Sequence, residues 1–572
     1  LKAKYQSQID EINRRRIRVG ADAISFGMQQ KWFSRKYLVE FLRESGYPNI
    51  KYGREEWVEE EDYSGKTVKK KDIAEDYENP FGSFFGTGRE QGFDKQLLDY
   101  LNGGKVTSSK AEILQAYKDQ VKTLEENFNV YMQQHDDADL LTEQYNLKFN
   151  GFTPFEYEGG GLDLPDISGR VKLHDYQNAA IRRSSEEGRG CLAFDVGLGK
   201  SYSALGLVSY NKKMGRSRKT CITVPKAVLA NWYHEAKKFY GNLDDALFVG
   251  FEPKRDKNGS IIQEPILDET GQAKTNPLTG EIEYQDALVQ DSPQEIFEKM
   301  WKIPQTNLSL VIMTKEKYGA IPMRPATKDR YAQKMLERQL ISDRDALVSV
   351  TGDDKASLGK GKEKLSYSEA VQQDRYRQQF SDEGTEKKGE FPYFEDMGFD
   401  SVIVDEAHEF KNSYQGGKET GNIAYLPTAP SAKRAIDMNM KMHYLREQNS
   451  GRGSYLLTAT PVTNSPFEIF NMLSLVCPVE EFERFGVYTV DDFIRVFGNI
   501  QTVQKTRVSG EVVDTDGLVG LKNLDGLRNL FHKYVNMKNA EDVQLPLPPH
   551  TEVHEDVEMS PIQEELYASL RE

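Results

Sequence analysis

"CLAFDVGLGKSYSALG" (residues 191–206) runs from an apolar strand through a glycine-containing turn into a helix. Gly197 and Gly199 would let backbone N–H groups turn toward phosphate oxygens, because side chains there would block the approach. Lys200 is expected to reach the β- and γ-phosphates of a nucleotide, and the Ser201 hydroxyl to ligate Mg²⁺. The helix N-terminus would face the anion. The stretch predicts a nucleotide site, and a simple glycine turn is the alternative.

A second stretch, SVIVDEAHEFKN (401–412), carries a β-branched strand into paired acids. In α/β proteins ligands bind at the carboxyl edge of the sheet, where Asp405 and Glu406 would lie. Asp405 suits a contact to Mg²⁺, and Glu406 suits orienting the attacking water. An acidic helix N-terminus is the alternative. Because phosphoryl transfer needs both a phosphate cradle and a metal–water pair, the two stretches together predict ATP hydrolysis.

The sequence around these stretches repeats one pattern, in which a short apolar run is followed by a turn and a helical segment. Such β-branched runs at helical spacing predict an α/β fold, with a parallel sheet covered by helices on both faces. The expected strands are CLAF (191–194), CITV (221–224), LSLVIMT (308–314), SVIV (401–404) and SYLLT (454–458).

The range over which this pattern repeats also predicts the domain organisation. Residues 1–165 have amphipathic patterns and are expected to form a mainly helical accessory domain. The ATPase lobe is expected at 166–480, and a helical extension at 481–572. The lobe has two insertions: about 251–300, where Asn, Asp, Gly and Pro predict hairpins, and about 320–396, which is highly charged.

Composition limits the classes of protein that fit. The 572 residues include 75 Lys and Arg against 90 Asp and Glu, a formal charge of −15. This balance excludes a generally basic, histone-like DNA binder, but it leaves room for a local DNA groove. Three cysteines without a C-x-x-C pair fit a reduced, cytosolic setting. We expect no membrane span, and the start at Leu1 indicates a piece of a longer protein.

Several stretches in the same order resemble motifs of the superfamily-two helicases, in particular the SWI/SNF-type DNA translocases. They are LHDYQNAAI (173–181), ITVPKAVLANWYHEAKKF (222–239), VIMTKEKY (311–318), DEAHEFKN (405–412) and LLTATPVTNSPFEIFNMLSLVCP (456–478). This family's phosphate loop has the form D-x-G-x-G-K-[ST]. It therefore does not require the glycine that the usual G-x-x-x-x-G-K-[ST] pattern places at Phe194.

The resemblance implies roles for further residues. Gln177 would read the adenine, Lys226 would lie near the DNA backbone, and His408, Thr458 and Thr460 would relay the nucleotide state. The implied fold is the first RecA-like helicase lobe, with ATP and Mg²⁺ as cofactors and duplex DNA as partner. The expected ATP-binding residues are Gln177, Gly197, Leu198, Gly199, Lys200 and Ser201, and the expected metal ligands are Ser201 and Asp405.

The chain also resembles the helicase part of large methylase–helicase proteins of phages and conjugative elements, a group that includes antirestriction proteins. LTEQYNLKFNGFTPFEYEGGGLDLPDIS (141–168) and FFGTGREQGF (84–93) carry this likeness. The methyltransferase motif Asn-Pro-Pro-Tyr/Phe is not matched, since NPFG (79–82) lacks the second proline and is expected to be a turn. The sequence leaves open whether a methyltransferase lies upstream in a longer chain.

LPLPPHTEVHEDVEMSPIQEELYASL (545–570) resembles the crossing into the second helicase lobe, where this family keeps its arginine fingers. Such residues contribute on the order of 10³–10⁵ in rate in nucleotide hydrolases. We therefore expect this piece alone to be a weak or inactive ATPase.

The sequence thus predicts an ATP-dependent, helicase-like DNA translocase that acts in the bacterial cytoplasm as DNA enters the cell or against restriction, or that is packaged in a phage virion. One alternative is a virion or DNA-delivery protein with a non-hydrolysing ATPase-like lobe. Another is an RNA helicase.

The basic run NKKMGRSRKT (211–220) could track phosphates or be a solvated loop, and Trp232 and Tyr233 are expected in the core.

Overall fold

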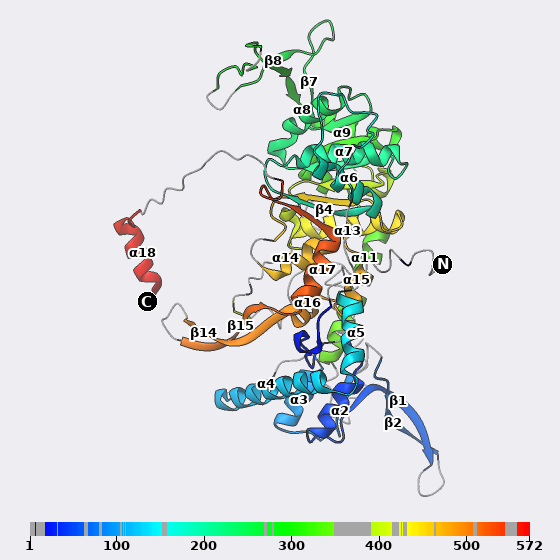
Figure 1. Cartoon of the computed structure of the whole chain (residues 1–572), viewed down its shortest axis with the longest axis vertical. Coiled ribbons are helices and arrows are strands. Elements are labelled where there is room, and N and C mark those ends of the chain that lie inside the picture. The colour runs from blue at the N-terminus through cyan, green and yellow to red at the C-terminus, as the bar shows by residue number, and fades with distance from the viewer. Residues whose placement is uncertain are drawn as a thin grey trace.

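The computed structural model describes residue 6 and residues 18–571, except 31, 62–66, 79–82, 88, 103–105, 107, 109, 151–156, 268–270, 277–278, 348–390, 414–422, 425, 427–431, 463–464, 507–511 and 544–556. The centre of the molecule is a sheet with the strand order β16-β4-β13-β12-β5-β11-β6. Every neighbouring pair of its strands is parallel. The predicted α/β class is therefore confirmed (Figure 1).

All the strands expected from apolar runs belong to this sheet. They are β4 (Arg189–Phe194), β5 (Thr220–Val224), β11 (Leu310–Thr314), β12 (Ser401–Val404) and β13 (Ser454–Thr458). Side chains along them are almost entirely buried, as both faces of a parallel sheet require. Their carboxyl ends share one edge, which brings the phosphate loop, Asp405 and Thr458 to the same side.

Two core clusters cover the two faces, because successive strand residues point to opposite sides. Leu192, Phe194 and Ile222 pack against helices α6 (Asp175–Glu187), α7 (Lys200–Lys213) and α8 (Leu229–Tyr240). Cys191 and Cys221 lie on the other face, which α9 (Pro293–Lys302), α10 (Lys315–Gly319) and α13 (Lys433–Gln448) cover. Cys191, Cys221 and Cys477 are buried free thiols, as expected of small core residues.

The sheet has two further strands, and the sequence pattern had not indicated either of them. They are β6 (Ala246–Val249) at one edge and β16 (Val535–Lys538) at the other. β16 pairs with β4, so the sheet takes a strand from beyond residue 480, where the lobe was expected to end. β16 (VNMK) has no apolar run and follows a helix with no turn signal before it, whereas β6 (ALFV) is an apolar run as short as SVIV and was overlooked.

The N-terminal region combines helices with a small sheet. Its helices are α2 (Lys36–Glu44), α3 (Phe93–Leu101), α4 (Ala111–Gln134) and α5 (Ala138–Phe149). The antiparallel sheet β2-β1-β3 is formed by β1 (Lys51–Glu61), β2 (Thr67–Glu75) and β3 (Ser83–Phe85). A mainly helical region therefore also holds three paired strands, of which β1 and β2 form an antiparallel hairpin. NPFG (79–82) lies outside the described residues.

The first insertion forms the expected hairpins. β7 (Phe251–Pro253) pairs with β10 (Leu288–Gln290), and β8 (Gln263–Pro265) pairs with β9 (Tyr284–Asp286). Figure 1 shows them projecting beyond the helices at the top of the molecule. The second insertion holds helix α11 (Pro325–Leu347), and its charged stretch TGDDKASLGKGKEK (351–364) lies outside the described residues.

The C-terminal region is not wholly helical. Helices α14 (Pro466–Ser474), α15 (Val479–Glu483), α16 (Val490–Phe497), α17 (Leu524–Tyr534) and α18 (Pro561–Arg571) agree with the expectation. Between them, β14 (Gly498–Thr506) and β15 (Val512–Leu521) form an antiparallel ribbon. The prediction of helix there was wrong because the β-branched residues in TVQKT and VVDTD favour a strand. The stretch HTEVHEDVEM (550–559), whose alternation predicts a strand, lies outside the described residues except for 557–559, which form no strand.

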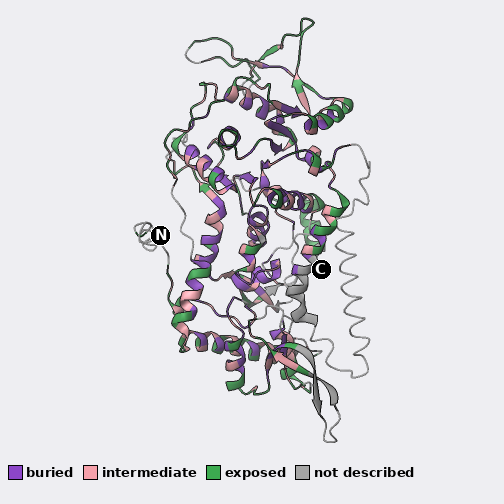
Figure 2. Cartoon of the chain, turned by 90° about the vertical axis from the view of Figure 1, so that its right-hand side faces the viewer, coloured by how far each residue is buried: buried purple, intermediate pink, exposed green. Residues whose placement is uncertain are grey.

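The accessory region and the C-terminal helices share one core. The Phe149 ring of α5 stacks on Tyr145 with centroids 4.4 Å apart, and lies 4.6 Å from the Phe485 ring. Asn529 of α17 donates a hydrogen bond of 3.0 Å to the Asn150 side chain. Figure 2 shows buried residues continuing through the helices that link the sheet to the accessory region. Across the described residues, no helix is both long and apolar enough to cross a membrane.

This shared core predicts a large effect for Phe149→Ala. Phe149 is 2% exposed, and removing a buried aromatic ring typically costs about 3–5 kcal/mol in free energy of unfolding. Leu147→Ala on the same helix is the matched control, because Leu147 is 53% exposed and such surface changes cost about 0.5 kcal/mol or less. Chemical denaturation measures both variants. Equal losses would contradict the packing of α5 against the C-terminal helices.

Candidate active site

The phosphate loop joins the end of β4 to the start of α7. Gly197 and Gly199 have φ of +86° and +70°, in the region that L side chains rarely adopt. A side chain at Gly197 would meet no atom within 4 Å, so conformation rather than crowding requires glycine there. At Gly199 an added Cβ would lie 2.3 Å from Gln177 Nε2. The loop therefore depends on glycine at both positions, and one of them faces open space.

Lys200 begins α7 and reaches back across the loop. Its Nζ donates to the carbonyl oxygens of Phe194 and Asp195, at 2.9 and 3.2 Å. Partial burial lowers the pKa of Lys200, and the charges of Glu406, Asp405 and Asp195 oppose this shift. The ammonium group thus lies near the carboxylates of the second motif, and backbone carbonyls are its hydrogen-bond partners.

Asp405 follows β12 and has both carboxylate oxygens engaged. Oδ2 accepts a hydrogen bond of 3.0 Å from Trp232 Nε1, and Oδ1 accepts one of 3.0 Å from the Glu406 backbone N–H. Burial raises the pKa of Asp405, the Glu406 charge raises it further, and the Trp232 hydrogen bond lowers it. Asp405 is 8% exposed, so its orientation is closely fixed.

Glu406 is one of the few non-glycine residues described with positive φ, at +45°. Such a conformation costs on the order of 1–3 kcal/mol and needs support from its surroundings. Part of this support comes from Lys315, whose Nζ donates to the Glu406 carbonyl oxygen at 2.9 Å. Lys315 also forms a 2.9 Å ion pair with Glu409. The sequence reasoning missed Lys315, although it directly follows the strand in VIMTKEKY.

The residues expected to relay the nucleotide state lie together beside Glu406. His408 Nδ1 is 3.2 Å from Glu406 Oε2 and 3.2 Å from Thr458 Oγ1. Thr458 ends β13, and its hydroxyl accepts a hydrogen bond of 3.1 Å from the Thr460 backbone N–H. A chain of polar contacts therefore runs from Glu406 across the sheet edge to Thr460.

Gln177 contacts the phosphate loop. Its Nε2 donates to the carbonyl oxygens of Leu198 and Gly199, at 3.3 and 3.1 Å, and its Oε1 accepts from the His174 backbone N–H at 2.8 Å. The Tyr176 hydroxyl also donates to the Leu198 carbonyl, at 2.9 Å. In this arrangement Gln177 ties α6 to the loop. The role in reading adenine remains a prediction.

The oxygen donors near the loop fit Mg²⁺. Ser201 contributes a hydroxyl and Asp405 a carboxylate, both of them hard oxygen ligands. Mg²⁺ is commonly held by one or two protein ligands together with nucleotide phosphates, so a hydroxyl and a carboxylate suffice on the protein side.

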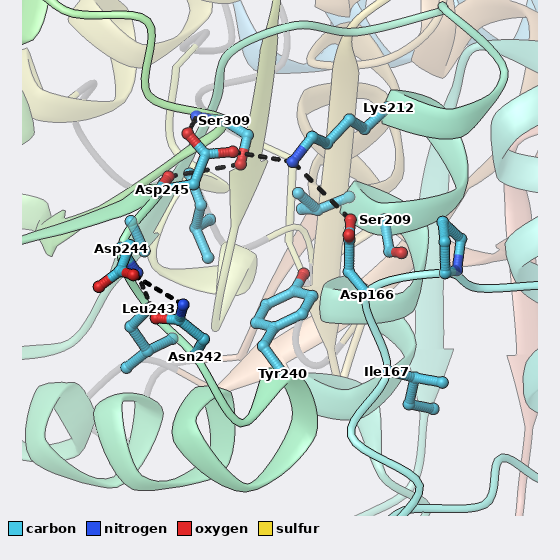
Figure 3. Close-up of a pocket in the computed structure, with 14 residues that line it drawn as sticks. Asp166, Ile167, Ser209, Lys212, Tyr240, Asn242, Leu243, Asp244, Asp245 and Ser309 are labelled. Carbon is cyan, nitrogen blue, oxygen red and sulfur yellow. Dashed lines mark hydrogen bonds and ion pairs between the residues drawn. The ribbon is translucent and has the colours of Figure 1, made fainter.

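The DNA-contact candidates lie in different places. Lys226 is exposed and follows β5 at the carboxyl edge of the sheet, in a short 3₁₀ helix at Lys226–Val228. The basic run is largely tied to the protein itself, because Lys219 is buried and Lys213 pairs with Asp163. Lys212 forms a 2.8 Å ion pair with Asp245 (Figure 3). These contacts favour a structural role for the run.

Lys212 borders a cavity of about 360 Å³, and Figure 3 shows residues that line it. Ala246 and Leu310, the first residues of β6 and β11, line it. The cavity therefore lies at the opposite edge of the sheet from the phosphate loop.

Two family models match the chain. Residues 111–300 match an SNF2-related domain, and residues 283–539 match a probable helicase domain. Beside the parallel sheet and the phosphate loop, these matches show that the chain carries an SNF2-related region and a helicase-like region. The resemblance to SWI/SNF-type helicases is thereby confirmed, and the phage relative described next confirms the resemblance to antirestriction proteins.

The relatives are consistent with this class. Defense against restriction protein B of Escherichia phage P1 is 38% identical over 598 aligned positions, which cover 100% of this chain and 26% of the phage protein. The chain thus spans about a quarter of that relative's length. A Caenorhabditis elegans homolog of the SWI/SNF-related matrix-associated actin-dependent regulator of chromatin, subfamily A containing DEAD/H box 1, is 27% identical over 100 residues, covering 17% of this chain and 10% of that protein.

Among solved structures, the Sulfolobus solfataricus SWI2/SNF2 ATPase core in complex with dsDNA aligns with a TM-score of 0.30 and 13% identity. The alignment covers 67% of this chain and 47% of that one. The ATPase core domain of the same protein has a TM-score of 0.29 and 13% identity, with 69% and 50% covered.

Proposed function

We propose that the chain forms the first ATPase lobe of a DNA translocase that hydrolyses ATP and tracks on duplex DNA. The observation that carries the proposal is the convergence of Lys200, Asp405 and Glu406 at one sheet edge, with the contact chain through His408 and Thr458 leading away from it. A phosphate cradle and a water-orienting acid support hydrolysis. The chain of polar contacts from Glu406 to Thr460, which we call the relay, supports coupling to a second ligand.

In this proposal the lobe extends from about residue 166 through β16, with residues 1–165 as an accessory domain. Gln177 and the loop hold ATP, Ser201 and Asp405 ligate Mg²⁺, and Lys226 contacts DNA. Mg²⁺ would neutralise charge on the transferring phosphate when bound. Glu406 orients the attacking water, and Lys200 neutralises the phosphate oxygens.

The similarity to the phage P1 protein named for defense against restriction supports an origin in a phage or mobile element. We propose that the motor belongs to a larger phage or mobile-element protein that acts on DNA as it enters the bacterial cytoplasm or against restriction, or that is packaged in the virion. A methyltransferase and a second helicase lobe would be further parts of that protein.

The test is ATP hydrolysis by the full-length protein with duplex DNA, with RNA and without nucleic acid, together with a strand-displacement assay. We expect stimulation by duplex DNA and little strand separation. Greater stimulation by RNA would favour an RNA helicase. Absence of hydrolysis under all conditions would favour a scaffold.

The relay predicts a specific effect of Thr458→Val, which removes the hydroxyl between His408 and Thr460 at nearly constant volume. We expect stimulation by DNA to fall by about 5- to 150-fold, the range of typical coupling free energies, with a smaller loss of basal hydrolysis. Thr458→Ser keeps the hydroxyl and should retain the stimulation. If Val and Ser variants behave alike, the hydroxyl is not part of the relay.

A further inference from the structure

Trp232 lies at the meeting point of the core and the candidate metal site. It is 2% exposed and packs in the cluster between α8 and the sheet, as its apolar ring predicts. Its indole Nε1, however, donates to Asp405 Oδ2 at 3.0 Å. A core position requires only an apolar ring, so the placement of this N–H on the carboxylate is an additional feature of the site.

The carboxylate of Asp405 is held at both oxygens. The Glu406 backbone N–H fixes Oδ1, and the Trp232 N–H fixes Oδ2. Because two donors in different directions restrict rotation about the side-chain bonds, Asp405 is held in one orientation. Metal ligands commonly rely on such outer hydrogen bonds to set their orientation.

The helix that carries Trp232 also approaches the other expected Mg²⁺ ligand. Glu235 lies three residues later on α8, on the same helix face, and interacts with the Ser201 side chain. α8 therefore faces both Ser201 and Asp405, although they belong to separate motifs of the sequence.

We propose that Trp232 is a positioning residue for the phosphoryl-transfer site, because its indole N–H holds the Asp405 carboxylate in the orientation needed to ligate Mg²⁺. This inference rests on the proposed function. It assigns Trp232 no contact with nucleotide or DNA.

The test measures binding of a fluorescent, non-hydrolysable ATP analogue to the full chain as Mg²⁺ is titrated. Trp232→Phe removes the N–H and keeps an aromatic ring. We expect the Mg²⁺ concentration at half-saturation to rise by about 10- to 100-fold, as is typical when a partner of a metal ligand is lost. Binding of the analogue without Mg²⁺ should be unchanged.

Tyr233→Phe is the matched control. The Tyr233 hydroxyl, on the neighbouring residue of α8, also donates to a carboxylate, Asp286 Oδ2 at 2.8 Å, but this carboxylate belongs to the hairpin β9. Its loss should leave the Mg²⁺ midpoint unchanged. An equal shift in both variants would assign the effect to α8 stability and overturn the proposal.

A second variant guards against misfolding of Trp232→Phe. Incorporating 3-benzothienyl-alanine at position 232 replaces the N–H by sulfur with almost the same shape, and it should shift the Mg²⁺ midpoint as Phe does. An unchanged midpoint in this variant would overturn the inference alone. A wild-type chain that does not bind the analogue in a Mg²⁺-dependent way would overturn the proposed function together with it.

Discussion

Replacing Lys200 by alanine should lower kcat/KM for ATP hydrolysis by about 10²–10³-fold, the usual effect of removing one group that stabilises transition-state charge. In the structure the Lys200 ammonium group bonds the carbonyl oxygens of Phe194 and Asp195, close to the carboxylates of the second motif. The ammonium group is thus held at the loop by the backbone. Steady-state hydrolysis by the full-length protein measures the effect.

Lys213→Ala provides the matched control for this prediction. Lys213 ends the same helix that Lys200 begins, and it pairs with Asp163 far from the loop. Both variants remove one lysine from α7, so a difference in their ATP hydrolysis would come from the role of Lys200 at the nucleotide. If Lys200→Ala hydrolyses ATP as fast as the wild type, the loop does not bind a reacting nucleotide, and the scaffold alternative gains support.

Glu406→Gln should lower kcat by about 10²–10⁴-fold and leave ATP binding nearly intact. The substitution keeps the size of the side chain and removes the charge that orients and activates the attacking water. The structure holds Glu406 in a strained backbone conformation, with its carbonyl bonded by Lys315 and its carboxylate next to His408. Single-turnover hydrolysis and nucleotide binding measure the two effects separately.

Glu316→Gln serves as the control, because Glu316 is an exposed acid that follows β11 at the same edge of the sheet. It should retain wild-type kcat. A parallel loss of nucleotide binding and kcat in Glu406→Gln would assign Glu406 to binding or to local folding instead of water activation.

Much of the fold could be predicted because its signals are local. Each central strand is a short β-branched run that ends in a turn, and the glycines of the loop and the acids after SVIV stand at strand ends. The edge strand β16 escaped prediction because VNMK has no apolar run, and the apolar run ALFV of β6 was overlooked. The ribbon β14–β15 escaped for a different reason, since its β-branched residues were present in the sequence and were taken for helix.

The sequence by itself determined which residues could bind phosphate and metal, because Lys200, Ser201, Asp405 and Glu406 occupy motifs whose chemistry follows from residue type and spacing. Only the tertiary structure decided what supports them. Trp232 and Asp405 are 173 positions apart, and Lys315 and Glu406 are 91 apart. Their hydrogen bonds exist because helices pack on a sheet whose strand order differs from chain order, and no local pattern specifies that packing.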